Sequence, residues 1–168
     1  MRVNKIIYFL LITLAIVAGV WWYVTRDERV IKKVIKEVAE YASNEESKGD
    51  IANALASQNL AERFTEEAII KWRWPEWPLI KSGEDFITGR DKIKESAIIA
   101  KRGGNLLFEV ENLKIRVEND AGVANATILL NFTDTGDLAT FETVFDLVKN
   151  NTWQINKVEA RPVKNKIP

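Results

Sequence analysis

The first pattern along the chain is an apolar run that carries no charge. It extends from Ile6 to Val24, and only Thr13 interrupts it. A helix of about 20 residues, rising 1.5 Å per residue, crosses a hydrocarbon layer of roughly 30 Å. Arg2 and Lys5 precede the run, and the aromatic residues 21–23 follow it at the depth of an interfacial aromatic belt. The run therefore predicts one transmembrane helix.

A cleaved signal peptide is the alternative, because Val17-Ala18-Gly19 forms a small-residue cleavage site. Cleaved signals usually turn polar after that site, whereas this run continues into bulky aromatic residues, which favours an uncleaved signal-anchor. Basic residues lie on both sides of the run, so the positive-inside rule decides little. A short basic tail usually stays in the cytoplasm, which predicts a domain outside it, in the periplasm if the source is bacterial. We divide the chain into an anchor (1–26), a domain (27–161) and a tail (162–168).

Three helical patterns follow the apolar run. Apolar residues recur at helical spacing from Val30 to Ala42 and predict an amphipathic helix that is nearly continuous with the anchor. Asp50 can cap a second helix, whose apolar stripe ends at Phe64. Asp91 can cap a third helix, which Gly103-Gly104 stops.

Strand patterns occupy the rest of the domain. The polar residues Thr65-Glu66-Glu67 are expected to end the second helix, and residues 68–70 to begin a short strand. From Leu106 onward the period changes to two, which predicts four antiparallel strands. The apolar set jumps from even to odd positions at Asn112, as an extra residue in a β-bulge causes. Turns are predicted at Asn119-Asp120-Ala121-Gly122, Asp134-Thr135-Gly136 and Asn150-Asn151. Helices followed by an antiparallel meander predict an α+β domain.

Composition removes several kinds of chemistry. The chain contains no cysteine and no histidine. Disulfides, thiol catalysis and thiolate metal sites are therefore excluded, as are the usual general base near neutral pH and the commonest zinc ligand. We expect no metal site and no cofactor. Lysine and arginine number 24 against 24 aspartate and glutamate, so no net field attracts nucleic acid, and none is expected as a partner.

Three stretches carry a resemblance to a known family. They are residues 60–70, which resemble the exit from helix two into a short strand, residues 89–95, which resemble the glycine-led start of helix three, and residues 153–158, which resemble the closing strand. From about Glu28 to Arg161 the chain resembles the nuclear transport factor 2-like superfamily, which includes SnoaL-like polyketide cyclases and ketosteroid isomerases. The resemblance implies three helices packed in a curved, mostly antiparallel sheet, a cone-shaped, cystatin-like roll with a pocket at its open end. It implies no function, because the fold hosts enzymes, binders and assembly modules.

The resemblance also predicts which side chains face the helices. In the isomerase branch a general base follows the first short strand and an acid lies on a later strand. Trp72 and Phe145 stand at those positions here, so neither role transfers, and we name no catalytic residue. The inward residues either fill the core or line a pocket for an apolar ligand. The candidate pocket set is Phe64, from the second helix, with Trp72, Phe108, Phe132, Phe141, Thr143, Phe145 and Trp153.

Two further surfaces each allow more than one role. Trp74 and Trp77 lie in a segment whose prolines exclude a regular element. They form either a hydrophobic flap over the open end of the cone, or a ligand lid, a partner surface or a contact with the bilayer. The outer strand face around Asn125 and Leu129 is polar enough for solvent and is an equally fair candidate for a homodimer interface.

Two functions from different classes follow. The leading hypothesis is a membrane-anchored, non-catalytic module that binds a partner or assembles at the membrane surface. The alternative is a SnoaL-like enzyme or carrier that acts on an apolar small molecule. That alternative needs an ionisable group near the mouth of the cone, such as Tyr41, Glu84 or Asp85.

Overall fold

The computed structural model of the 168-residue chain describes residues 2–44, 49–73, 83–102 and 105–163. Within the first helix, side chains are described at residues 11–16, 19 and 22 and from residue 25 onward.

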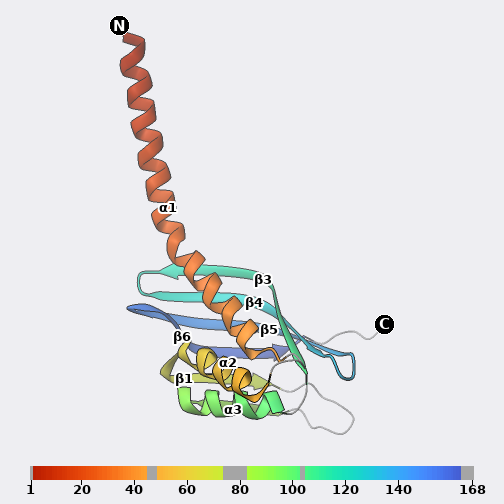
Figure 1. The fold of residues 1–168 in the computed structure, drawn as a ribbon. Coiled ribbons are helices and arrows are strands. Elements are labelled where there is room, and N and C mark those ends of the chain that lie inside the picture. Colours follow the sequence, from red (N-terminus) through yellow and green to blue (C-terminus); the bar gives the residue numbers. More distant parts are fainter. Residues whose placement is uncertain (1, 45–48, 74–82, 103–104, 164–168) are drawn as a thin grey trace.

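Three helices and six strands make up this described part of the chain (Figure 1). The helices are α1 (Arg2–Ala42), α2 (Asp50–Glu62) and α3 (Arg90–Arg102). The strands are β1 (Phe64–Arg73), β2 (Glu84–Thr88), β3 (Leu106–Glu118), β4 (Ala121–Phe132), β5 (Asp137–Asn150) and β6 (Thr152–Pro162). The α+β class is thus confirmed, and β2 is a strand that the hydrophobic pattern did not predict.

The strands form one curved, mixed sheet in the order β2-β1-β6-β5-β4-β3. β1 and β6 run parallel, and every other neighbouring pair in this sheet is antiparallel. All three helices lie on one face of the sheet (Figure 1). The strands β2 and β3 are its two edges, so the helix-facing side is a trough between them.

The long helix α1 contains both the predicted anchor and the amphipathic helix that was predicted to be nearly continuous with it. It runs for 41 residues without interruption, and its N-terminal half projects beyond the sheet (Figure 1). Within the described residues, no helix combines the length and the apolar character that crossing a membrane requires. In the predicted span Ile6–Val24, the side chains at positions 6–10, 17, 18, 20, 21, 23 and 24 lie outside the described residues.

The junction between α2 and β1 differs from the prediction. Phe64 is the first residue of β1 and not part of a helix, and the polar stretch Thr65–Glu67 lies within the strand. The backbone N–H of Ile155 donates to the carbonyl of Arg63 at 2.8 Å, and Phe64 pairs with Ile155 in β6. The register then shifts before Ile69. Pairing with a strand 90 residues away therefore overrides the local polar pattern, which is why the sequence placed the strand too late.

The predicted β-bulge and turns are confirmed. The register between β3 and β4 shifts between Glu111 and Lys114, and Asn112 has a φ of 51°. Asn119 and Asn151, in two of the predicted turns, both have a φ of 54°. Asparagine tolerates this left-handed conformation better than most residues, which explains its use at all three positions.

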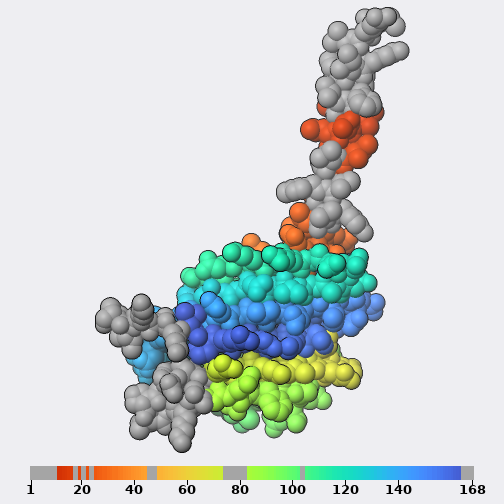
Figure 2. Space-filling model, turned by 180° about the vertical axis from the view of Figure 1, so that it is seen from behind, coloured from red at the N-terminus to blue at the C-terminus, as the bar shows by residue number. Residues whose placement is uncertain are grey.

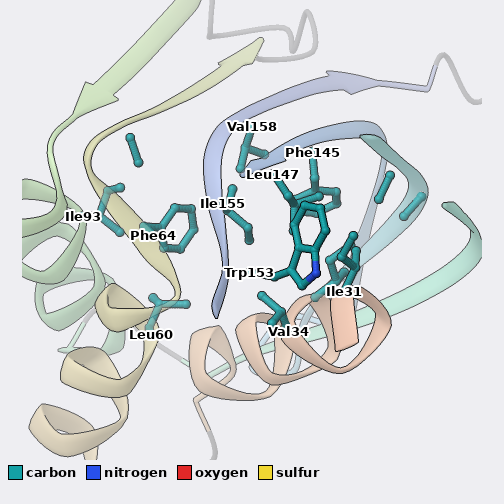
Figure 3. Packing of buried hydrophobic residues seen from close by; sticks show 14 residues of the cluster. Ile31, Val34, Leu60, Phe64, Ile93, Phe145, Leu147, Trp153, Ile155 and Val158 are labelled. Atoms are coloured by element: carbon teal, nitrogen blue, oxygen red, sulfur yellow. The ribbon is translucent and has the colours of Figure 1, made fainter. Parts of the chain in front are cut away.

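The core lies between the helices and the inner face of the sheet (Figure 3). The second half of α1 contributes Ile31, Val34 and Ile35, each 4% exposed or less. Trp153 packs beside Ile31 and Val34, and Ile155 is fully buried next to it (Figure 3). The same helix that projects from the domain is thus also one wall of its core.

Candidate functional site

Pairing across the sheet orders the candidate pocket residues into rows on the helix-facing side. Phe145, Thr143 and Phe141 are successive inward residues of β5. Thr143 pairs with Ala160 of β6, and Ala160 pairs with Trp72 of β1, so Trp72 and Thr143 share a row. The alternation predicted from the sequence therefore assigns the three β5 residues to the correct face, and Trp72 joins them there.

The remaining aromatic candidates lie toward the far end of the same face. Phe141 pairs with Ile128 in β4, and Phe132 is four residues farther along that strand. Phe108 pairs with Leu130, between these two levels. The trough thus carries aromatic side chains along its length.

Burial divides the candidate set into two groups. Phe64, Phe145 and Trp153 are 2%, 5% and 2% exposed and belong to the hydrophobic core. Thr143 is 4% exposed. The other four are half-buried: Trp72, Phe108, Phe132 and Phe141. The first group fills space between helix and sheet, so only the half-buried end of the trough could admit a ligand. That a ligand binds there stays a prediction.

Thr143 carries a polar atom with no partner at the boundary between these groups. Its Oγ1 is buried and has no hydrogen-bond partner among the described residues. Buried hydroxyl groups are normally paired with protein or water, because desolvating one without compensation costs about 1–3 kcal/mol. A polar atom of a ligand or a water molecule at the open end would satisfy it.

The sequence reasoning missed an open groove of about 300 Å³ between α1 and the edge strand β3. It is lined by Lys36, Ala39, Glu40, Ser43, Leu107, Phe108 and Val110. Of the predicted pocket residues only Phe108 reaches it. The groove depends on how α1 crosses the sheet edge, and no local sequence signal encodes that crossing.

A polar cluster at the rim of the core connects α1 to the β5–β6 hairpin. The indole N–H of Trp153 donates to the Asp27 carboxylate at 3.0 Å, and Lys149 Nζ donates to the same carboxylate at 3.0 Å. The bond from Trp153 lowers the pKa of Asp27 most, and Lys149 lowers it further, while partial burial opposes both. Lys149 Nζ also lies 5.7 Å from the centre of the Trp153 ring, within cation–π range.

Of the ionisable candidates, Asp85 lies in the same row of the sheet as Trp72 and Thr143. Tyr41 is half-buried on α1 and packs against the core. Glu84 and Asp85 are exposed on β2, where Asp85 pairs with Trp72 and Glu84 lies 4.0 Å from Arg73. Trp74 and Trp77 lie outside the described residues.

Comparison with solved structures identifies the fold. No family model matches the chain, and no curated protein matches it. An NTF2-like protein with a cystatin-like fold from Novosphingobium aromaticivorans superposes with a TM-score of 0.64 at 13% identity, over 89% of this chain and 90% of that one. A protein proposed to be a scytalone dehydratase, from the same organism, gives 0.57 at 16% identity over 81% and 83%. A protein proposed to be a ketosteroid isomerase, from Parabacteroides distasonis, gives 0.52 at 14% identity over 80% and 86%.

These similarities confirm the predicted resemblance: the chain has the NTF2-like, cystatin-like fold. At such identities the likeness concerns the fold alone, and the fold supports several functions. Among the described residues, the helix-facing side of the sheet is largely apolar, and the buried hydroxyl of Thr143 on it has no hydrogen-bond partner.

Proposed function

We propose that the protein is a membrane-anchored, non-catalytic module that binds a partner or assembles through its NTF2-like domain. The observation that carries this proposal is that one half of α1 packs in the domain and the other half projects from it. Its second half is a wall of the core through Ile31, Val34 and Ile35, whereas its first half extends past the sheet and carries the uncharged run Ile6–Val24. A projecting helix that carries such a run suits insertion into a bilayer.

The Asp27 cluster supports a rigid connection between anchor and domain. Asp27 is three residues beyond the apolar run and bonds Trp153 and Lys149 of the β5–β6 hairpin. A helix held in this way transmits the position of the anchor to the domain. We propose the non-cytoplasmic side for the domain, which is the periplasm in a bacterium.

The non-catalytic part of the proposal is supported by the chemistry of the trough. At its core end the inward side chains of the sheet are apolar except for Thr143. Two aspartates share the inward face farther out: Asp85 is paired with Trp72 and Asp137 with Phe132, and both are exposed. A general base needs to reach its proton within about 3 Å and to have a suitably shifted pKa. The core end of the trough, where a substrate would be most enclosed, offers no ionisable side chain from the described strands.

The outer face of the sheet is the proposed assembly surface. No described helix covers it, and Figure 2 shows it as a broad surface of adjacent strands. Leu129 and Val144 are half-buried outward residues, and Val123 is 39% exposed. A face that carries apolar side chains among polar ones suits a symmetric dimer interface.

Native mass spectrometry of the full chain, released from membranes in mild detergent, tests this assignment. A ligand-free dimer that Leu129→Glu converts to a monomer supports an assembly module. The matched control is Leu55→Glu on α2, where the leucine is 61% exposed on the helical side, and it should stay dimeric. A wild-type monomer that carries a small molecule would contradict assembly and favour the alternative below.

The alternative is a SnoaL-like enzyme or carrier for an apolar small molecule. The unpaired hydroxyl of Thr143 favours it, as does the likeness in fold to proteins proposed to be a dehydratase and an isomerase. Once a co-purified ligand is identified, three substitutions would distinguish an enzyme from a carrier. They are Tyr41→Phe, Glu84→Gln and Asp85→Asn. Loss of turnover in one of these variants indicates an enzyme, and unchanged ligand binding in all three indicates a carrier.

A further inference from the structure

The first turn of α1 beyond the apolar run carries an arginine whose side chain folds back toward the N-terminus. Arg29 Nη2 donates to the carbonyl of Trp22 at 3.2 Å, and its Nε donates to the carbonyl of Thr25 at 3.3 Å. Its Cζ lies 5.6 Å from the centre of the Trp22 ring. Helical side chains tilt toward the N-terminus, so this direction is the natural one for a long side chain.

If α1 is anchored in a bilayer, this direction of the Arg29 side chain determines how deep its guanidinium group lies in the membrane. The apolar run ends at Val24, so a group that bonds the carbonyls of Trp22 and Thr25 lies at the boundary of the hydrocarbon. Tryptophan is enriched at that depth, next to the lipid headgroups, and Trp22 is 57% exposed. The Arg29 side chain would therefore lie level with lipid phosphate groups.

The local charge is not neutralised by the protein. Neither Arg26 nor Arg29 has a carboxylate within 4.0 Å among the described residues, and both are exposed. Asp27, which stands between them, is engaged by Trp153 and Lys149 instead. A planar guanidinium presents five N–H donors in a fork that matches phosphate. The two bonds of Arg29 to backbone carbonyls leave donors for a ligand.

We propose that Trp22, Arg26 and Arg29 form a headgroup site that binds the phosphate of anionic lipids, such as phosphatidylglycerol, at the exit of the anchor. This inference rests on the proposed membrane anchoring. The Asp27 cluster contributes by holding α1 to the domain. The site fixes how deeply the anchor inserts and keeps the domain close to the membrane surface.

The test uses the full chain in nanodiscs that contain phosphatidylcholine and phosphatidylglycerol in equal amounts. Lipids retained on the protein are identified by native mass spectrometry after release from the disc. Wild-type protein should retain phosphatidylglycerol preferentially. Each basic side chain near an anionic surface contributes about 1 kcal/mol, so Arg26→Gln with Arg29→Gln should reduce this preference by about 25-fold. The charge-matched control is Lys92→Gln with Lys94→Gln on α3, which should leave it unchanged.

The outcomes separate this inference from the proposed anchoring. Equal retention of both lipids by the wild type, or an unchanged preference in the arginine variant, overturns the headgroup site while the anchor stands. A full chain that never enters the disc overturns the anchor and the site together. Circular dichroism of each variant shows whether the fold is retained, which is expected because both arginines are exposed.

Discussion

Substituting Asp27 by alanine should weaken the connection between α1 and the β5–β6 hairpin. The change removes a charge-assisted bond from the buried Trp153 indole and an ion pair with Lys149, both at 3.0 Å. A hydrogen bond to a charged group contributes about 1.5–3 kcal/mol, but the Asp27 side chain is 27% exposed, so solvent reduces that figure. Exposed ion pairs such as that with Lys149 add about 0–1 kcal/mol. We expect Asp27→Ala to lower the free energy of unfolding by about 1–2 kcal/mol.

The effect should depend on pH in a definite direction. The pKa of Asp27 is lowered in the folded protein from its ordinary value of 3.8. A lowered pKa means that the unfolded chain binds the proton more tightly, so the carboxylate stabilises the fold above pH 3.8. That stabilisation is lost as the pH falls through the folded pKa. The difference between wild type and Asp27→Ala should therefore be full at pH 7 and smaller below pH 3.

Urea unfolding of the full chain in mild detergent, followed by near-ultraviolet circular dichroism, measures this difference. With an m-value of about 2 kcal/mol/M, the midpoint of Asp27→Ala should fall by about 0.5–1 M urea. Asp27→Asn, which keeps an oxygen acceptor for the indole, should lose less. Glu28→Ala is the neighbouring control, because Glu28 bonds neither Trp153 nor Lys149. Equal midpoints for Asp27→Ala and Glu28→Ala would refute the reasoning.

Three other substitutions test the core in the same assay. Thr143→Val removes a buried hydroxyl without a partner and should be neutral or stabilise by up to about 1 kcal/mol; a loss above 1 kcal/mol would reveal a hidden partner. Gly122→Ala adds a Cβ 2.8 Å from Ile31 Cδ1, so it should destabilise by about 1–3 kcal/mol, and Ile31→Val should relieve part of that. Phe145→Ala should cost about 3–5 kcal/mol, whereas Leu138→Ala, at a site 65% exposed, should cost almost nothing.

Much of the sheet could be predicted because its signals are local. The period of two, the shift at Asn112 and the asparagines at the turns specify β3 to β6 without knowledge of distant residues. The start of β1 at Phe64 could not be predicted, because it depends on parallel pairing with β6. β2 is only five residues long, lies at the edge and is largely exposed, so it lacks an alternating pattern.

For the candidate site, the sequence could predict only which side of the sheet its residues occupy. Alternation assigned Thr143 and Phe141 to the inner side of the sheet, where the strand pairing places them. Whether that side is filled or open depends on how closely α1, α2 and α3 approach it. Packing of this kind arises from many long-range contacts, and no residue pattern specifies the remaining space. Phe145 and Trp153 were predicted to line a pocket but are buried in the core. The half-buried end of the trough remains a candidate pocket.

The most direct test of the membrane-anchored module is the location and intact mass of the 168-residue chain after expression without an N-terminal tag. Membranes are washed with alkaline carbonate, which releases peripheral proteins, and the retained protein is weighed by mass spectrometry. The account predicts a retained chain with the mass of the uncleaved 168 residues. A chain released into the wash, or one shortened at Val17-Ala18-Gly19, would contradict it.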